Sequence, residues 1–190
     1  MNQTTLQSSI AQISKTSDED IALLVSCAVA RKLKKGEPLL KEGDLCRSFY
    51  LVEKGYLRTW YNKNGVPINL SFTFEGHFIS NLKSFKSRQP SDLTIEAGEP
   101  SVVWIFDLNT MAATYKAHPA ITLFVRCLAI RVLLASEEHS SLFKMYTPAE
   151  RYHYIEKNNP QLLQRISLSQ LASYLGVTRE TLSRIRAKSN

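Results

Sequence analysis

Cysteine is scarce in this chain of 190 residues, and the three cysteines, Cys27, Cys46 and Cys127, lie far apart. No two of them form a CxxC pair, and none forms a ligand-like pair with a histidine. The sequence therefore predicts neither a disulfide framework nor a structural metal site. This use of cysteine fits a reduced, cytoplasmic setting.

Long hydrophobic runs are also missing. The most apolar stretch, residues 121–135, is interrupted by Arg126 and Arg131 and is too short to span a bilayer, so no membrane segment is expected. The first twelve residues lack a basic start followed by an apolar core, and no secretory signal is expected. With 44% hydrophobic residues the chain can form a packed core, and we expect a soluble globular protein.

Acidic residues are fewer than basic ones. The chain has 24 Lys and Arg against 17 Asp and Glu, a formal net charge of +7. Residues 147–190 contain seven Lys and Arg against three Glu, so more than half of the basic excess lies in this segment. A basic excess suits an anionic partner such as nucleic acid.

The segment LSQLASYLGVTRETLSRIR, residues 168–186, predicts two short helices joined by a tight turn. Gly176 follows the first helix where a left-handed residue is needed, and Ala172 is small where the helices must cross. Thr178 is placed to cap the second helix. The apolar positions of the pair are Leu171, Ala172, Leu175, Val177, Leu182 and Ile185. Together these features predict a helix-turn-helix, a DNA-binding motif.

The second helix of this motif has an apolar and a polar face. Leu182 and Ile185 face inward. The outward positions are Arg179, Glu180, Ser183 and Arg184. An ordinary amphipathic helix pair with a solvated charged face is the alternative. Because the small residue, the glycine, the cap and the apolar positions fall at mutually consistent spacings, the sequence favours DNA binding.

Residues 39–107 predict mainly short strands, each rich in β-branched and aromatic residues and ended by glycine, asparagine, proline or acidic residues. They are LLKEGD, SFYLVEKG, YLRTWYNKNG, VPINLSFTFEG, DLTIEAGE and SVVWIFD. Asn64-Gly65 is a strong two-residue hairpin signal. A short helix is predicted from Ser17 to Val29, capped by Ser17. The expected fold class is α+β, with an antiparallel β-roll of the jelly-roll or double-stranded β-helix type.

A long helix is predicted from Pro119 to about Met145. Its apolar positions follow steps of four and three, which predicts a heptad seam and a parallel homodimer. The seam positions are Ile121, Val125, Leu128, Val132, Ala135, His139, Leu142 and Tyr146. A second stripe contains Phe124, Cys127 and Leu134, so one face is expected to pack on the roll and the other on a partner helix. Burial of both stripes within one subunit is the alternative.

His139 lies on this predicted seam. Protonation would place like charges between two subunits, so the dimer would weaken below about pH 6.5. A neutral, hydrogen-bonded histidine is the alternative.

A further helix is predicted to begin at Thr147-Pro148-Ala149-Glu150 and to end at Asn158-Asn159-Pro160. Residues 161–165 leave room for at most a very small β wing, so the last unit is predicted as a helix-turn-helix domain of the winged-helix type. The predicted division is a β-roll domain at 1–118, a dimerisation helix at 119–146 and the DNA-binding domain at 147–190.

A wrapped β-roll, a long helix and a terminal helix-turn-helix, in this order, resemble the Crp/Fnr family, named after the cyclic-AMP receptor protein and the fumarate-nitrate regulator. The similar pieces are KEGD at 41–44, FYLVEKGYLR at 49–58 and TRETLSRI at 178–185, and the likeness covers nearly the whole chain. The resemblance implies a transcription factor rather than an enzyme, with an effector-sensing roll. It also implies a homodimer on double-stranded DNA, with RNA polymerase as a further candidate partner.

The second helix of the motif resembles both branches of this family. Arg179, Glu180 and Arg184 resemble the cyclic-AMP receptor pattern, and Glu180, Ser183 and Arg184 the fumarate-nitrate pattern. Arg can donate two hydrogen bonds to guanine and Glu can accept one from cytosine. We expect a TGA-containing half-site, inverted in a palindrome, with half-sites about 34 Å apart. Phosphate contacts are expected from Thr178, Thr181, Arg186 and Lys188.

The family's cyclic-nucleotide cassette is degenerate in this sequence. The family uses Gly-Glu-Leu for the ribose and Arg-Ser/Thr for the phosphate, and the matching stretches here are Ser80-Asn81-Leu82 and Ser91-Asp92. Asp92 would repel a phosphate without a compensating cation. Lys83, Lys86 and Arg88 could supply one or remain solvated. We expect no cyclic-AMP binding in the usual mode, and keep Ser80, Asn81, Leu82, Ser91 and Asp92 as a candidate pocket for an unknown small-molecule effector.

No cofactor is predicted. Three scattered cysteines do not match the iron–sulfur site of the oxygen-sensing branch, and His77 alone is a weak candidate for a haem ligand. Two alternatives stay open. One is an effector-independent regulator with a structural roll. The other is a cupin-like enzyme, for which the four histidines, His77, His118, His139 and His153, show neither HxH spacing nor a glutamate ligand pattern.

Overall fold

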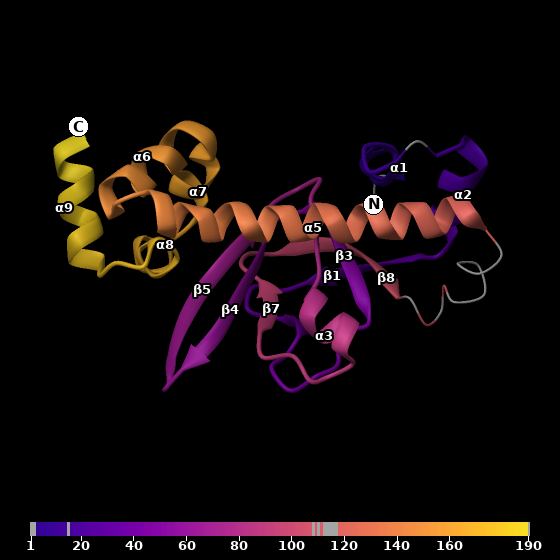
Figure 1. The fold of residues 1–190 in the computed structure, drawn as a ribbon, viewed down its shortest axis with the longest axis horizontal. Helices are drawn as coiled ribbons and strands as arrows, with labels where there is room; N and C mark the ends of the chain where they lie inside the picture. The colour runs from indigo at the N-terminus through magenta and orange to yellow at the C-terminus, as the bar shows by residue number, and fades with distance from the viewer. Residues whose placement is uncertain (1–2, 15, 108, 110, 112–117, 190) are drawn as a thin grey trace.

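The β-roll consists of two four-stranded antiparallel sheets, as the computed structural model shows (Figure 1). The structure describes residues 3–14, 16–107, 109, 111 and 118–189. One sheet has the order β1 (Ala28–Leu33), β8 (Ser101–Asp107), β3 (Ser48–Lys54) and β6 (Phe78–Ile79). The other has the order β2 (Pro38–Leu40), β7 (Thr94–Ala97), β4 (Leu57–Lys63) and β5 (Val66–Thr73). The predicted α+β class and the antiparallel roll are confirmed.

The inner faces of the two sheets form an apolar core. Because successive strand residues point to opposite faces, alternate residues of each strand meet there. Val52 and Val103 from the first sheet and Leu57, Ile95 and Ala97 from the second are at most 1% exposed. The sheets therefore hold each other in place by apolar burial.

The β4–β5 hairpin has the turn that its sequence predicts. Asn64 and Gly65 both have positive φ, 53° and 87°, as a type I′ turn requires. The N–H of Gly65 donates to the Asn62 side chain over 2.8 Å, which fixes the turn. The hairpin projects from the roll beside the helical domain (Figure 1).

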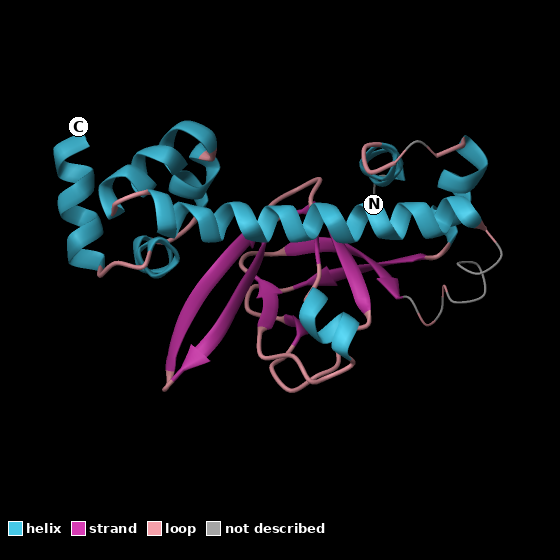
Figure 2. Cartoon of the chain, in the orientation of Figure 1, coloured by secondary structure: helices cyan, strands magenta, loops and turns pink. Residues whose placement is uncertain are grey.

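The outer face of the first sheet packs against helices. These are α1 (Gln3–Ala11), α2 (Asp18–Ser26) and the N-terminal half of α5 (Pro119–Met145), which lies across the roll in Figures 1 and 2. Leu6 and Ile10 of α1 are fully buried against this core. Ser17 caps α2 by accepting from the N–H of Asp20, as predicted, but the helix ends at Ser26 and β1 begins two residues later.

Helix α5 has 27 residues and is long and apolar enough to cross a membrane, by length and composition only. The expectation that this segment is too short for a span was therefore wrong. Ile121, Phe124, Val125 and Leu128 are buried in the core under the roll's outer face.

The predicted dimer seam on α5 needs correction. Ile121, Val125 and Leu128 are at most 8% exposed and pack inside their own chain, so they are not available to a partner helix. Leu142 is also buried. Exposed apolar residues of α5 include Leu123, Ile130, Leu133 and Leu134. Phe124 of the second predicted stripe is 1% exposed, so neither predicted stripe separates the buried face from the exposed face.

Beyond the roll, α5 leads into four short helices. They are α6 (Pro148–Asn158), α7 (Pro160–Arg165), α8 (Leu168–Leu175) and α9 (Arg179–Ser189). The capping box predicted at α6 is present, because Thr147 accepts from Glu150 and Glu150 accepts from the N–H of Thr147. Helix α7 occupies the place left for a β wing, and no strand is found between 147 and 189, all of which the structure describes. The winged form of the domain was wrong.

Candidate nucleic-acid interface

The helix pair α8–α9 is bounded by two capping side chains, and a glycine and one of those caps form the turn between the helices. Ser167 caps α8, and Gly176 ends it with φ 68°, a left-handed conformation. A Cβ on Gly176 would lie 2.8 Å from a ring carbon of Phe143, so a side chain there would also collide with α5. Thr178 begins α9 by accepting the N–H of Thr181 over 3.2 Å. The turn is therefore fixed by its own sequence.

The apolar face of this helix pair forms one core with α6 and α7. Leu171, Ala172, Leu175 and Leu182 are at most 2% exposed. They pack with Tyr152, Ile155, Leu162 and Ile166. Because these contacts hold one face of α9, the opposite face must point to solvent.

The outward face of α9 carries the residues predicted to contact DNA. The exposed members of that set are Thr178, Arg179, Glu180, Ser183, Arg184, Arg186 and Lys188, and Thr181 is half-buried. Arg184 donates to the hydroxyl of Thr181 over 3.3 Å. Within the described part of the chain, no ion pair engages Arg179, Glu180 or Lys188, so their charges are free to meet a ligand.

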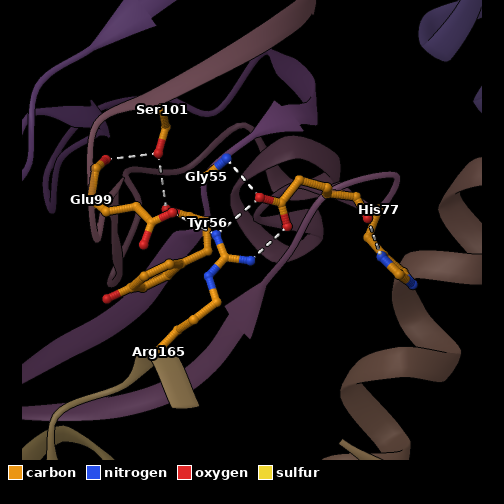
Figure 3. A network of polar contacts seen from close by, with 7 residues as sticks. Gly55, Tyr56, His77, Glu99, Ser101 and Arg165 are labelled. Atoms are coloured by element: carbon orange, nitrogen blue, oxygen red, sulfur yellow. Dashed lines mark hydrogen bonds and ion pairs between the residues drawn. The ribbon is translucent and has the colours of Figure 1, made fainter. Parts of the chain in front are cut away.

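One arginine joins the helical domain to the roll (Figure 3). Arg165, at the end of α7, donates to both carboxylate oxygens of Glu75 over 2.8 and 2.9 Å, and to Glu99 over 2.5 Å. Glu75 also accepts the N–H of Gly55 over 2.8 Å. The guanidinium lies over the ring of Phe74, at 5.0 Å. The planar guanidinium group of an arginine forms strong and directional hydrogen bonds with carboxylates.

This arrangement shifts the pKa values of both partners. Hydrogen bonds to Glu75 raise the pKa of Arg165 further above its ordinary range. Burial alone would raise the pKa of Glu75, but hydrogen bonds from Arg165 and from the Gly55 N–H outweigh it and lower that pKa. Both groups therefore stay charged at neutral pH. We call Arg165, Glu75 and Glu99 the interdomain clamp.

The hairpin supplies a second contact between the roll and the helix-turn-helix. The backbone N–H of Asn69 donates to the hydroxyl of Ser173 over 3.0 Å, and its side chain donates to the carbonyl of Gln170 over 3.1 Å. Phe72 meets Tyr174 edge to face, with ring centroids 5.4 Å apart. Helix α8 is thus held by both strand and side-chain contacts.

His139 lies at the junction of α5 and α8, not between subunits. Its ring stacks on Tyr174, with centroids 4.3 Å apart, and meets Phe143 edge to face. Its Nε2 atom is buried and has no hydrogen-bond partner among the residues that the structure describes. Burial is the main cause that lowers the pKa of His139, a backbone group of Tyr174 opposes this, and the charge of Arg151 adds to it. The predicted role at the dimer seam is corrected to a contact within one chain.

The candidate effector residues form a closed polar network around α3 (Leu82–Ser87). Asn81 caps α3 by accepting from Ser84, and donates to the hydroxyl of Ser91 over 2.8 Å. Ser91 in turn donates to the carbonyl of Leu93, and Ser80 to that of Ser48. Ser80, Asn81 and Ser91 are buried and Leu82 is half-buried. Asn81 and Ser91 thus hydrogen-bond to each other, and Ser80 and Ser91 donate to backbone carbonyls, so the polar groups of these three residues are engaged within the chain.

Asp92 does have a compensating cation. Lys83 forms an ion pair with it over 2.5 Å, and the hydrogen bond from Lys83 lowers the pKa of Asp92. Both side chains are more than half exposed. Lys83 is therefore engaged by Asp92. Lys86 and Arg88 are exposed.

No group of three or more His, Cys, Asp and Glu that could hold a metal ion occurs among the residues with described positions. His77 is exposed and contacts the carbonyl of Glu75 through Nδ1. Cys46 is buried, and Cys27 and Cys127 are half-buried.

Sequence reasoning missed two residues near the interface. Arg165 gave no signal, because its two acids lie 66 and 90 positions away in the chain. His153 was weighed only as a metal ligand, and its position opposite α9 depends on how α6 crosses that helix. Neither arrangement can be inferred from local spacing.

Residues 30–118 match the family model described as the cyclic nucleotide-binding domain. A comparison with curated protein sequences finds no match.

Solved structures with this fold include FixK2 from Bradyrhizobium japonicum, which is 20% identical, with 85% of this chain and 83% of that chain covered and a TM-score of 0.71. The c-di-GMP-responsive global regulator CLP from Xanthomonas campestris is 14% identical over 90% and 91% of the two chains, with a TM-score of 0.71. A candidate transcriptional regulator of the Crp/Fnr family from Eubacterium rectale is 18% identical over 90% and 82%, with a TM-score of 0.68.

These likenesses agree with the family that the sequence motifs indicate. They concern regulators rather than enzymes. Residues 30–118 therefore match the cyclic nucleotide-binding domain family, and the chain has the fold of the Crp/Fnr regulators.

Proposed function

We propose that this chain is a homodimeric, sequence-specific DNA-binding transcriptional regulator of the Crp/Fnr type. The observation that carries the proposal is the exposed polar face of α9, where Arg179, Glu180, Ser183 and Arg184 stand on a helix whose other face is buried. A helix held in this way can enter the major groove and contact base edges. RNA polymerase remains a candidate partner, and the proposed cellular location is the cytoplasm.

Selection of bound fragments from random duplex DNA tests this function directly. We expect an inverted repeat with TGA in each half, because Arg184 and Glu180 together favour a G·C pair, and half-site centres about 34 Å apart. Recovery of unrelated sequences at moderate salt would contradict the proposal.

Two substitutions separate base contacts from phosphate contacts. Arg184→Ala should cost roughly 1–3 kcal/mol of binding free energy and relax one position of the site, because it removes a base contact. Lys188→Ala should weaken all sequences alike and flatten the salt dependence, because it removes a phosphate contact. Binding titrations on the selected site and a scrambled duplex distinguish the two. Unchanged base preference in Arg184→Ala would contradict the assignment of this residue as a base contact.

The dimer that we propose uses the exposed stripe of α5. Leu123, Cys127, Ile130 and Leu134 follow steps of four, three and four, the spacing of a parallel coiled coil. Leu123, Ile130 and Leu134 are 49–57% exposed in one chain, and a second copy would cover them. The C2 symmetry of such a dimer matches an inverted repeat in DNA.

A second candidate function is an effector-independent DNA-binding regulator, in which the roll has a structural role and binds no effector. It is favoured by the hydrogen bonds that Ser80, Asn81 and Ser91 make within the chain, to Ser48, Ser91 and Leu93 respectively, because they occupy the polar groups of the cassette. A thermal shift screen with cyclic mononucleotides, c-di-GMP and a metabolite panel tests it. A ligand that binds the folded chain raises its melting temperature, so a shift would assign an effector.

A further inference from the structure

Helices α6 and α9 form a shallow groove beside the exposed face of α9. Its volume is about 340 Å³, and its lining residues are Ala149, His153, Thr181, Arg184, Ile185 and Lys188. Three of these have nitrogen-bearing side chains, His153 from α6 and Arg184 and Lys188 from α9, and none is acidic. Nitrogen groups from two helices, two of them cationic, thus converge on one hollow of the surface.

The position of the groove follows from the spacing on α9. Thr181, Arg184 and Lys188 are three and four residues apart, so they form one stripe along the edge that faces α6. If α9 enters a major groove, the sugar-phosphate strand that bounds that groove runs along an edge of the helix. The edge next to α6 carries the cations.

His153 is oriented by a neighbour on its own helix. Its Nδ1 lies 3.3 Å from a carboxylate oxygen of Glu156, and its side chain is 55% exposed. Because Glu156 engages Nδ1, Nε2 is the ring nitrogen that remains for a second partner, and an imidazole nitrogen can form a hydrogen bond with a phosphate group.

We propose that this groove binds a backbone phosphate of duplex DNA, with His153 as a DNA contact from α6 that acts beside Lys188 from α9. This inference rests on the proposed function. The ligand is a phosphodiester, which the site recognises by charge and by N–H donors, so His153 contributes affinity and no base preference.

His153→Ala tests the site. We expect it to bind the selected site and a scrambled duplex about three- to tenfold more weakly, by the same factor for both. His153→Lys keeps a nitrogen donor in the groove and should restore the affinity for both duplexes. His118→Ala is the matched control, because His118 is an exposed histidine at the opposite end of α5.

The outcomes separate this inference from the proposed function. If His153→Ala keeps the wild-type affinity on a specific site, the phosphate site is wrong and the function stands. If His153→Ala weakens binding and His153→Lys does not restore it, the residue has a structural role and the inference fails. Melting curves of each variant check folding. If the wild-type chain shows no sequence preference, the proposed function itself fails.

Discussion

His139 shows how one side chain can tie stability to pH. It stacks on Tyr174 from α8, and the charged group packed nearest to it is Arg151 from α6, whose guanidinium lies over Phe143. Burial lowers the pKa of His139, and Arg151 adds to the shift. The unfolded chain therefore binds the proton more readily, so this contribution to stability is complete above about pH 6.5 and is lost as the pH falls from there through the folded-state pKa.

We expect His139→Phe to reduce this loss. A phenylalanine keeps the stacking with Tyr174 and removes the titrating group. Between pH 7.5 and 5.0 the melting temperature of the variant should fall less than that of the wild type. Each pKa unit corresponds to about 1.4 kcal/mol, and 1 kcal/mol shifts the melting temperature of a chain of this size by roughly 2–4 °C. Parallel pH profiles of the two proteins would contradict the assignment.

Among the helices and strands, the best-predicted elements had strong local signals. Six of the roll strands followed β-rich runs, the hairpin followed Asn64-Gly65, and α6 and α8 followed their caps, whereas β1 and β6 lie outside the predicted runs. Helix α1 was missed because its sequence is polar apart from Leu6, Ile10 and alanine, and it forms by burying that pair against the roll. Helix α3 is only six residues long and was not predicted.

The face of a helix was harder to predict than its existence. Both predicted stripes of α5 have coiled-coil spacing, and the buried face of the helix takes Ile121, Val125 and Leu128 from one and Phe124 from the other, because the outer face of the first sheet decides which side is covered. The outward residues of α9 were predictable, because the buried Leu182 fixes the rotation of a short helix. The contacts of Arg165 were not, because they depend on tertiary structure.

The interdomain clamp gives α7 a testable role. Arg165→Ala leaves Glu75 and Glu99 without their cation and should destabilise the chain by roughly 1–3 kcal/mol, because the lost hydrogen bonds are charged and partly buried. A double-mutant cycle with Glu75→Gln measures the coupling, which we expect to be about 0.5–3 kcal/mol.

Arg31→Ala is the matched control for the clamp. Arg31 pairs with Glu37 at the surface, where solvent screens the charges, so its loss should change the melting temperature little. Additive effects of Arg165→Ala and Glu75→Gln would show that the clamp contributes nothing as a unit.

At the scale of the whole molecule, the proposed dimer places Cys127 opposite its own copy. Residues on the seam of a parallel two-stranded coiled coil face their equivalents. Mild oxidation or a short bismaleimide should therefore give a covalent dimer, which Cys127→Ser abolishes and Cys27→Ser does not. Non-reducing electrophoresis and sedimentation provide the readout. A monomer at micromolar concentration, or crosslinking that survives Cys127→Ser, would contradict this seam.

The aromatic contacts around α8 also limit how modular the chain can be. Tyr56, Phe72 and Phe74 of the roll belong to the same apolar cluster as Leu171, Leu175 and Leu182. A fragment cut at Thr147 would leave its part of that cluster open to water. Truncations and reporter fusions made at Thr147 should therefore yield an aggregation-prone fragment rather than an autonomous DNA-binding unit.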